Sequence, residues 1–315
     1  MSTTISLFPS EMTTNVDIGT SVLIRRRPRM TPSLPVQRPR PHPGEPSRIG
    51  KVRLRSFGWY GGKYSHLDWL LPLLPAAHHY CEPFGGSAAV LLNREPAPVE
   101  TYNDLDGEVV NFFKVLREDT DELVRVISLT PFSREEFYGS LVRNHGVIDS
   151  LERARLFFVR ARQVRTGLAQ TASLGRWANC KNTSRGGMAG VVSRWLGSVR
   201  DLPDIANRLL RVQIENRPAP ELIRLYDDKK TLFYCDPPYP HNSRGDSKAY
   251  SFEMDDSAHK ELAKVLGQCQ GQVAISGYRC ALMDKLYSGW KRVDAAPKKC
   301  HSIKKIRQEA LWLNF

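Results

Sequence analysis

The stretch from Phe233 to Pro240 places an acid, two prolines and an aromatic residue directly after an apolar run. The prolines end a strand and fix the backbone, so Asp236 and the carbonyl of Pro237 can offer two acceptors to one amino group. An amine conjugated to an aromatic ring is a poor nucleophile. Drawing its hydrogens toward two acceptors localises the nitrogen lone pair and orients it for attack.

We therefore predict Asp236, Pro237 and Tyr239 as catalytic residues that activate a ring amine, with Tyr239 stacked on the ring. A base in a duplex must leave the stack to reach such a pocket. The alternative, a strand that simply ends at prolines, explains neither the acid nor the aromatic residue.

A second group of residues suits a ligand that resembles a nucleotide. In residues 80–93 a strand leads through Gly85 and Gly86 to a helix for which Ser87 is the predicted cap. Helix N-termini after glycine turns expose N–H groups to such ligands. The stretch matches neither glycine fingerprint for dinucleotides or triphosphates, which favours a nucleoside cofactor without a pyrophosphate. A plain strand–turn–helix connection is the alternative.

Two further stretches add candidate ligand contacts. Asp104 follows the second strand, where an acid can accept hydrogen bonds from ribose hydroxyls, whereas Asp106 is predicted as an acid at a helix N-terminus. In residues 56–67, Trp59 offers a flat apolar wall and Lys63 a positive charge. The alternative for this stretch is a surface turn with a buried tryptophan.

The elements that must position these residues read as an α/β sheet. Strands are predicted at residues 78–84, 98–103, 210–216, 231–236, 272–278 and 309–315. Amphipathic helices are predicted at residues 107–118 and 259–268, the second capped by Asp256 or Ser257. Between residues 119 and 209 the strand rhythm gives way to a helical pattern.

The charge distribution indicates a polyanionic partner. The net charge is +13, and residues 131–217 alone hold 15 Lys and Arg against 7 Asp and Glu. We predict DNA contacts for arginines of a helix-like segment and of a glycine loop at residues 182–190, namely Arg160, Arg162, Arg165 and Arg185. A solvated helical surface is the alternative interpretation.

Other features argue against several protein classes. Residues 1–50 hold eight of the 21 prolines and little apolar pattern, so we predict a disordered basic tail that adds nonspecific phosphate affinity. The six cysteines form no CxxC pair, which predicts reduced thiols and no metal site. No apolar run approaches the ~20 residues of a membrane span, and no signal peptide is evident, so we expect a cytoplasmic protein.

With WYGGK, YCEPFGGSAAV, NDLDGEVVNFF and CDPPY in this order, the chain resembles DNA adenine-N6 methyltransferases that use S-adenosylmethionine. It resembles the branch whose target-recognition region lies between the cofactor motif and the catalytic motif. The resemblance implies a doubly wound, Rossmann-like α/β sheet at residues 51–118 and 210–315, with a helical DNA-recognition lobe inserted at residues 119–209. It also implies double-stranded DNA as the partner and leaves open whether a restriction endonuclease accompanies the enzyme.

The same resemblance implies roles for individual residues. Positions matching Trp59, Lys63, Asp104 and Asp236 contact the cofactor or the reacting centre, and Glu82, Phe84 and Gly85 belong to the cofactor motif. One departure is Ala88, where many members have glycine. The residues leave three other functions open: methylation of cytosine N4, methylation of an RNA amine, and DNA binding without catalysis.

Overall fold

A computed structural model describes residues 53–142, 149–167, 169–243, 252–299 and 306–315. The predicted tail at residues 1–50 lies outside the described residues, as does most of the polar stretch after Tyr239.

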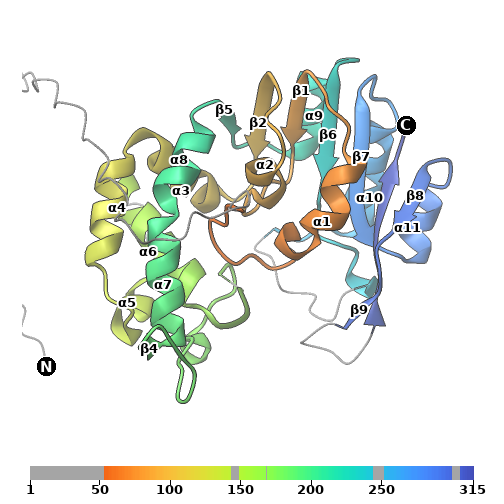
Figure 1. Cartoon of the computed structure of the whole chain (residues 1–315). Coiled ribbons are helices and arrows are strands. Elements are labelled where there is room, and N and C mark those ends of the chain that lie inside the picture. The colour runs from red at the N-terminus through yellow and green to blue at the C-terminus, as the bar shows by residue number, and fades with distance from the viewer. Residues whose placement is uncertain (1–52, 143–148, 168, 244–251, 300–305) are drawn as a thin grey trace, which may run out of the picture. The chain divides into compact units, whose positions relative to one another are not determined.

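A seven-stranded sheet in the order β5-β2-β1-β6-β7-β11-β8 forms the frame (Figure 1). All six predicted strands are confirmed: β1 (His79–Glu82), β2 (Val99–Asn103), β5 (Val212–Glu215), β6 (Thr231–Cys235), β7 (Gln272–Tyr278) and β11 (Glu309–Leu313). The edge strand β8 (Lys291–Asp294) was not predicted, because three of its four residues are charged.

The direction of the strands decides which residues reach the site. The strands β5, β2, β1, β6 and β7 pair in parallel, whereas β11 runs antiparallel between β7 and β8. The first residue of β11 therefore lies at the same edge as the last residues of the parallel strands. Glu309 pairs with Tyr278, the last residue of β7.

Both faces of the sheet are covered, which explains why β6 is apolar throughout. Leu232 and Tyr234 belong to one buried cluster, and Phe233 and Cys235 belong to the other. Side chains alternate between the faces of a strand, so a central strand with two covered faces reads as a continuous apolar run. The arrangement confirms the predicted Rossmann-like sheet with helices on both faces.

The helices that cover the sheet follow the predicted pattern, with differences at their ends. The first face is covered by elements that include η1 (Lys63–His66), α1 (Leu67–Leu70), η2 (Leu71–Leu73), α2 (Ala89–Asn93) and α3 (Gly107–Glu118); the second is covered by α9 (Ala219–Tyr226), α10 (Asp256–Leu266) and α11 (Ala281–Leu286). Asp106 caps α3 by accepting a hydrogen bond from the Glu108 N–H, as expected of an N-terminal acid.

Two predicted helix caps are wrong. The cap of α10 is Asp255, which accepts from the N–H of Ala258, so the helix begins at one of the predicted caps, Asp256. Ser87 does not cap α2. The residue before that helix is Ala88, which has a left-handed backbone at φ 55° and no capping hydrogen bond from its side chain. Alanine tolerates this left-handed conformation less well than glycine does.

Residues 120–209 connect α3 to the edge strand β5. They form α4 (Thr120–Leu129), α5 (Arg134–Gly139), α6 (Ser150–Gln163), η3 (Arg165–Gly167), η4 (Leu174–Arg176), α7 (Gly190–Arg200) and α8 (Leu202–Leu209). In Figure 1 these helices gather beside the β5 end of the sheet. Phe112 of α3 stacks on Phe158 of α6, so they share one core with the first face.

The predicted glycine loop at residues 182–190 contains a short hairpin. Its strands are β3 (Ser184–Arg185) and β4 (Met188–Ala189), joined by Gly186 and Gly187, both with positive φ. Two consecutive left-handed residues make the tight turn that suits a twisted hairpin, and glycine adopts them without steric cost. Elsewhere, η5 (His241–Ser243) follows the prolines, and β9 (Lys298–Lys299) pairs with β10 (Ile306–Arg307). Within the described ranges no helix is long and apolar enough to cross a membrane.

Candidate active site

The predicted chemical motifs meet at the carboxyl edge of three neighbouring strands. Glu82 ends β1, Asp104 follows β2, and Asp236 follows β6. Because β2, β1 and β6 are adjacent and parallel, their ends open into one crevice, where ligands bind in folds of this type.

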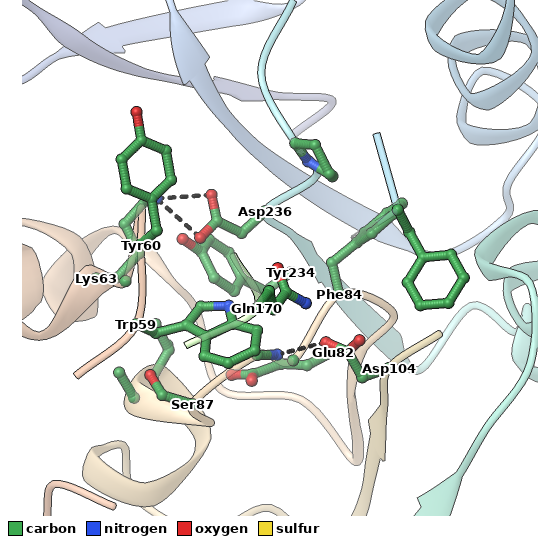
Figure 2. A pocket seen from close by; sticks show the side chains of 17 residues that line it. Trp59, Tyr60, Lys63, Glu82, Phe84, Ser87, Asp104, Gln170, Tyr234 and Asp236 are labelled. Atoms are coloured by element: carbon green, nitrogen blue, oxygen red, sulfur yellow. Dashed lines mark hydrogen bonds and ion pairs between the residues drawn. The ribbon is translucent and has the colours of Figure 1, made fainter. Parts of the chain in front are cut away.

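A cavity occupies this crevice (Figure 2). Its lining residues are Trp59, Tyr60, Gly62, Lys63, Glu82, Phe84, Gly85, Gly86, Ser87, Ala89, Val90, Asp104, Gln170, Tyr234, Asp236, Pro238 and Phe252. The structure thus brings all seven predicted cofactor-binding residues to one cavity. Their contacts with a cofactor remain predictions.

The glycine turn after β1 leaves no room for side chains. A Cβ at Gly85 would lie 2.2 Å from the ring of Tyr102, and one at Gly86 would lie 2.7 Å from the indole nitrogen of Trp59. The hydroxyl of Tyr102 donates to the Gly86 carbonyl at 2.8 Å. Close approach of backbone to aromatic rings therefore requires glycine at both positions.

Asp104 holds this turn while facing the cavity. One of its oxygens accepts from the N–H of Gly86 and the other from the N–H of Asp106, each at 2.8 Å. Burial raises the pKa of Asp104 to about 6, although these hydrogen bonds favour its charged form. Each carboxylate oxygen still has a lone pair for a ligand hydroxyl.

Burial perturbs Glu82 strongly. It is 2% exposed and accepts a hydrogen bond from the Tyr80 hydroxyl at 2.7 Å. Burial raises the pKa of Glu82 to about 8, so the residue is mostly protonated at neutral pH. A positively charged ligand beside it would favour the ionised form.

Lys63 and Asp236 form an ion pair at the carboxyl end of β6. The Lys63 ammonium donates to both oxygens of Asp236, at 2.6 and 2.8 Å (Figure 2). It also donates to the Gly61 carbonyl at 2.8 Å. Lys63 is 4% exposed. Burial opposes its charge, but Asp236 and Glu309 outweigh this effect, and the pKa of Lys63 is raised. Burial also raises the pKa of Asp236, against the lowering effect of Lys63.

Tyr239 lies beside Asp236, but it is not among the residues that line the cavity. It is 6% exposed, and its hydroxyl donates to Glu309 and lies 3.2 Å from an Asp236 oxygen. Its ring meets the ring of Tyr278 edge to face. Pro237 is buried behind the same turn. Stacking of Tyr239 on a base and acceptance by the Pro237 carbonyl therefore remain predictions.

Comparison with known proteins identifies the family. Residues 59–308 match the model of the D12 class N6 adenine-specific DNA methyltransferases. The chain belongs to this family.

Curated relatives agree with the assignment to these adenine-specific methyltransferases. A DNA adenine methylase of Salmonella typhimurium is 26% identical over 242 residues, covering 73% of this chain and 82% of the relative. One of Vibrio cholerae is 25% identical over 247 residues, covering 73% and 83%. The DNA N-6-adenine-methyltransferase of Escherichia phage P1 is 28% identical over 125 residues, 38% of this chain and 16% of that protein. The predicted class, an adenine-N6 DNA methyltransferase, is confirmed.

Several residues of the methyltransferase cavity were not predicted. Tyr234 is the fourth residue of β6, and Gln170 comes from the connection after η3, where its amide donates to Asp106 at 2.8 Å. Residues two apart in a strand point to the same face, so the position of Tyr234 two residues before Asp236 could have marked it as a cavity residue. Nothing in the sequence marks Gln170 or Phe252. Glu309 was missed as well, because it opens a strand that otherwise reads as core.

The four arginines predicted to contact DNA lie in different environments. Arg160 is 3% exposed, donates to the Ser140 carbonyl at 2.7 Å and lies 3.8 Å from Glu108. Direct contact of Arg160 with DNA does not fit this structure, because its guanidinium is enclosed by the protein. Arg162 is half-buried and donates to the Arg194 carbonyl at 3.2 Å. Arg165 and Arg185 are exposed.

The described residues contain no group of three or more His, Cys, Asp and Glu that could hold a metal ion. Cys81 and Cys235 are buried and unpaired, and burial raises the pKa of both thiols.

Proposed function

We propose that this methyltransferase transfers the methyl group of S-adenosylmethionine to N6 of adenine in double-stranded DNA, with Asp236 as the acceptor for the amine. The observation that carries the proposal is the placement of Asp236 at the tip of β6, on a cavity shared with Glu82 and Asp104. The family supports adenine N6 as the target atom.

The residues around the cavity fit the chemical groups of this cofactor. Asp104 offers carboxylate oxygens to ribose hydroxyls, and Trp59 offers a flat apolar surface to a ring. Glu82 is a buried acid for a ligand that carries positive charge. The glycine turn allows the cofactor to approach the backbone. When bound, S-adenosylmethionine supplies a methyl group on a positively charged sulfur, and that bond breaks with its electron pair left on sulfur.

The protein's part in the reaction is to orient and polarise the amine. Asp236 accepts a hydrogen bond from one N6–H group. The carbonyl of Pro237, held by a rigid backbone, accepts a hydrogen bond from the other. The pyrrolidine rings prevent this backbone from relaxing. The site is buried, so these interactions are stronger than they would be in water.

Lys63 affects how strongly the Asp236 carboxylate accepts a hydrogen bond from the amine. In this structure both Asp236 oxygens accept from Lys63. Each retains one lone pair, and Lys63 lowers the pKa of the Asp236 carboxyl against the raising effect of burial. We propose that Lys63 holds Asp236 in the orientation that faces the adenine amine.

We propose that the duplex lies along residues 119–209, with Arg165 and the hairpin residue Arg185 at phosphates or base edges. Both are exposed, and Arg185 precedes a two-glycine turn that lets backbone approach DNA. In this proposal the division into a catalytic part at residues 51–118 and 210–315 and a recognition part at residues 119–209 follows the chain order. Relatives from bacteria and a phage support action on cytoplasmic DNA, with a restriction endonuclease as the companion to look for.

Transfer of tritium from labelled S-adenosylmethionine to duplex DNA, followed by nucleoside analysis, tests the proposal. We expect label in N6-methyladenine with the wild-type chain. With Asp236→Ala we expect none, while DNA binding is retained. Label in cytosine or RNA, or activity that survives Asp236→Ala, would contradict it.

A further inference from the structure

Glu309 brings a second carboxylate to the reacting centre. It is 6% exposed, and its Oε1 lies 3.2 Å from the Lys63 ammonium and accepts from the Tyr239 hydroxyl. Lys63 and Tyr239 are thus shared between Asp236, which lines the cavity, and Glu309, which does not. A buried acid that is connected to the reacting acid through two shared donors needs an explanation beyond packing.

The Tyr239 hydroxyl is the connection that matters. It has a single hydrogen and two carboxylates within hydrogen-bond distance, Glu309 and, at 3.2 Å, Asp236. Glu309 is the closer partner, and we assign the hydrogen to that side. Toward Asp236 the phenol oxygen then presents a lone pair, and one hydrogen position between Tyr239 and Asp236 stays open.

The two carboxylates are not equally neutralised by Lys63. The ammonium donates to Asp236 at 2.6 and 2.8 Å, whereas Glu309 is 3.2 Å away. Lys63 uses a further hydrogen on the Gly61 carbonyl. Lys63 therefore lies closer to Asp236 than to Glu309, so less of the Glu309 charge is compensated by the shared ammonium.

Other titratable groups surround this cluster. Tyr234 of β6 and Glu82 of β1 interact electrostatically with Asp236, Tyr234 also interacts with Glu309, and Tyr278 of β7 pairs with Glu309 in the strand register. The Tyr234 hydroxyl exchanges a hydrogen bond with Ser276, and Glu82 accepts from Tyr80. Tyr239 and Lys63 link Asp236 to Glu309 by hydrogen bonds and ion pairs.

We propose that Asp236, Tyr239 and Glu309 form a proton relay, in which Glu309 takes up the proton that adenine N6 loses on methylation. The inference rests on the proposed function. The nitrogen gains a methyl group and forms a bond with its lone pair. Its N–H proton then passes to Asp236, while the electrons of that bond stay on nitrogen. Asp236 donates to the Tyr239 oxygen, and Tyr239 passes its own hydrogen to Glu309. Glu309 acts here as a positioning residue and proton acceptor behind the site.

Single-turnover methyl transfer as a function of pH tests the relay. The proteins to compare are the wild type, Glu309→Gln, Tyr239→Phe and the double variant. We expect each single variant to lose roughly 10- to 100-fold in rate, which is less than a complete acid–base contribution because Asp236 is retained. The double variant should be no slower than the slower single variant, since both changes interrupt one path.

The pH dependence separates the relay from a structural role. Glu309 raises the pKa of Asp236, so in Glu309→Gln the decline of the rate toward acid should move to lower pH. Three results would overturn the relay. The double variant could lose rate by the product of the two single losses, or the rate of Glu309→Gln could be unchanged. Glu309→Gln could also lose rate equally at every pH, with no shift of the pH at which the rate declines toward acid. Thermal melting of each variant identifies losses that come from unfolding. A wild-type chain that methylates no DNA would overturn the proposed function and the relay with it.

A second measurement needs no cofactor. Infrared titration follows protonation of the Asp236 carboxyl in the protein alone, with Asp236→Asn identifying its band. Glu309→Gln should lower the pH at which this band appears. An unmoved band would show that the two acids are not coupled and would overturn the relay, whatever the activity of the wild type.

Discussion

Two buried ion clusters of this protein have opposite compositions. At the cavity, two carboxylates, Asp236 and Glu309, share the single cation Lys63. At the other site, two arginines, Arg208 and Arg211, surround the single carboxylate Glu100, which is fully buried in β2. The first cluster has an excess of negative charge and opens on a cavity, whereas the second has an excess of positive charge and joins α8 to the sheet.

The difference shows which buried charges serve chemistry and which serve the fold. Arg208 donates to both oxygens of Glu100, at 2.6 and 2.7 Å, and to the Leu91 carbonyl at 2.8 Å, so this cluster satisfies backbone as well as charge. Asp236 instead accepts from a lysine and keeps lone pairs toward the cavity. A buried charge that the fold does not saturate is available to a substrate.

The largest expected effect is that of Asp236→Asn on activity. The amide keeps the size of the side chain but loses the charge that polarises the amine, so methyl transfer should fall about 10²–10⁴-fold. Stability should change little, because Lys63 retains Glu309 as its partner. Rates under single-turnover conditions and chemical denaturation of the same samples check both parts. A large loss of stability would mean that this cluster also serves the fold.

The matched change in the other cluster is Glu100→Gln. It leaves Arg208, 11% exposed, without its charged partner, and removing one member of a buried pair costs about 3–5 kcal/mol. The free energy of unfolding from urea titration should show this loss, while the folded fraction keeps its methyl-transfer rate. A protein that is stable but inactive would break the contrast between the clusters.

The stability of the protein as a function of pH tests the protonation state of another buried acid, Glu82. Burial raises its pKa from 4.5 to about 8, so the folded state holds this proton more tightly than the unfolded state. Its contribution to stability is present at low pH and is lost as pH rises through this window, by on the order of 1.4 kcal/mol per pH unit.

Glu82→Gln should therefore be stabilised relative to the wild type, increasingly so as pH rises from about 5 to about 8. Urea denaturation of both proteins at several pH values measures the difference. Burial also raises the pKa of Asp104, to about 6. Titration of Asp104 changes the free energy of unfolding of both proteins equally, so it cancels in the difference between them. A difference that stays constant with pH would show that Glu82 is ionised in the folded protein.

The smallest expected effect is that of Arg185→Ala on DNA affinity. An exposed arginine at a phosphate should give a loss of about two- to tenfold and reduce the slope of affinity against salt by about one. Arg224→Ala, exposed on α9 at the opposite face of the sheet, removes the same charge and should change affinity less. Equal effects of the two variants would show that only net charge matters.

The strands and the acids at their ends were predictable because short apolar runs and prolines are local signals. Asp236, Asp104 and Glu82 each follow or end an apolar run, and parallel neighbours bring such ends together. The cap residues were less predictable, since Asp255, Asp256 and Ser257 are all suitable types and only the backbone selects among them.

Long-range geometry accounts for the remaining failures. Glu309 reaches the site only because β11 reverses direction between β7 and β8, which no local pattern reveals. Arg160 was expected at DNA because arginines recur along a helix-like segment of the basic region, but this pattern does not state which face of the helix is covered. Here α6 packs against α3, and Arg160 lies on the covered side.

The reversed strand has a consequence for biosynthesis. Lys63, Asp236 and Glu309 leave the ribosome in that order, and Glu309 arrives only after most of the described sheet has been made. Until β11 is inserted, β7 and β8 have no shared neighbour and Lys63 meets a single acid. In a nascent chain the second carboxylate therefore joins Lys63 only when β11 pairs with β7, after Asp236 has already been made.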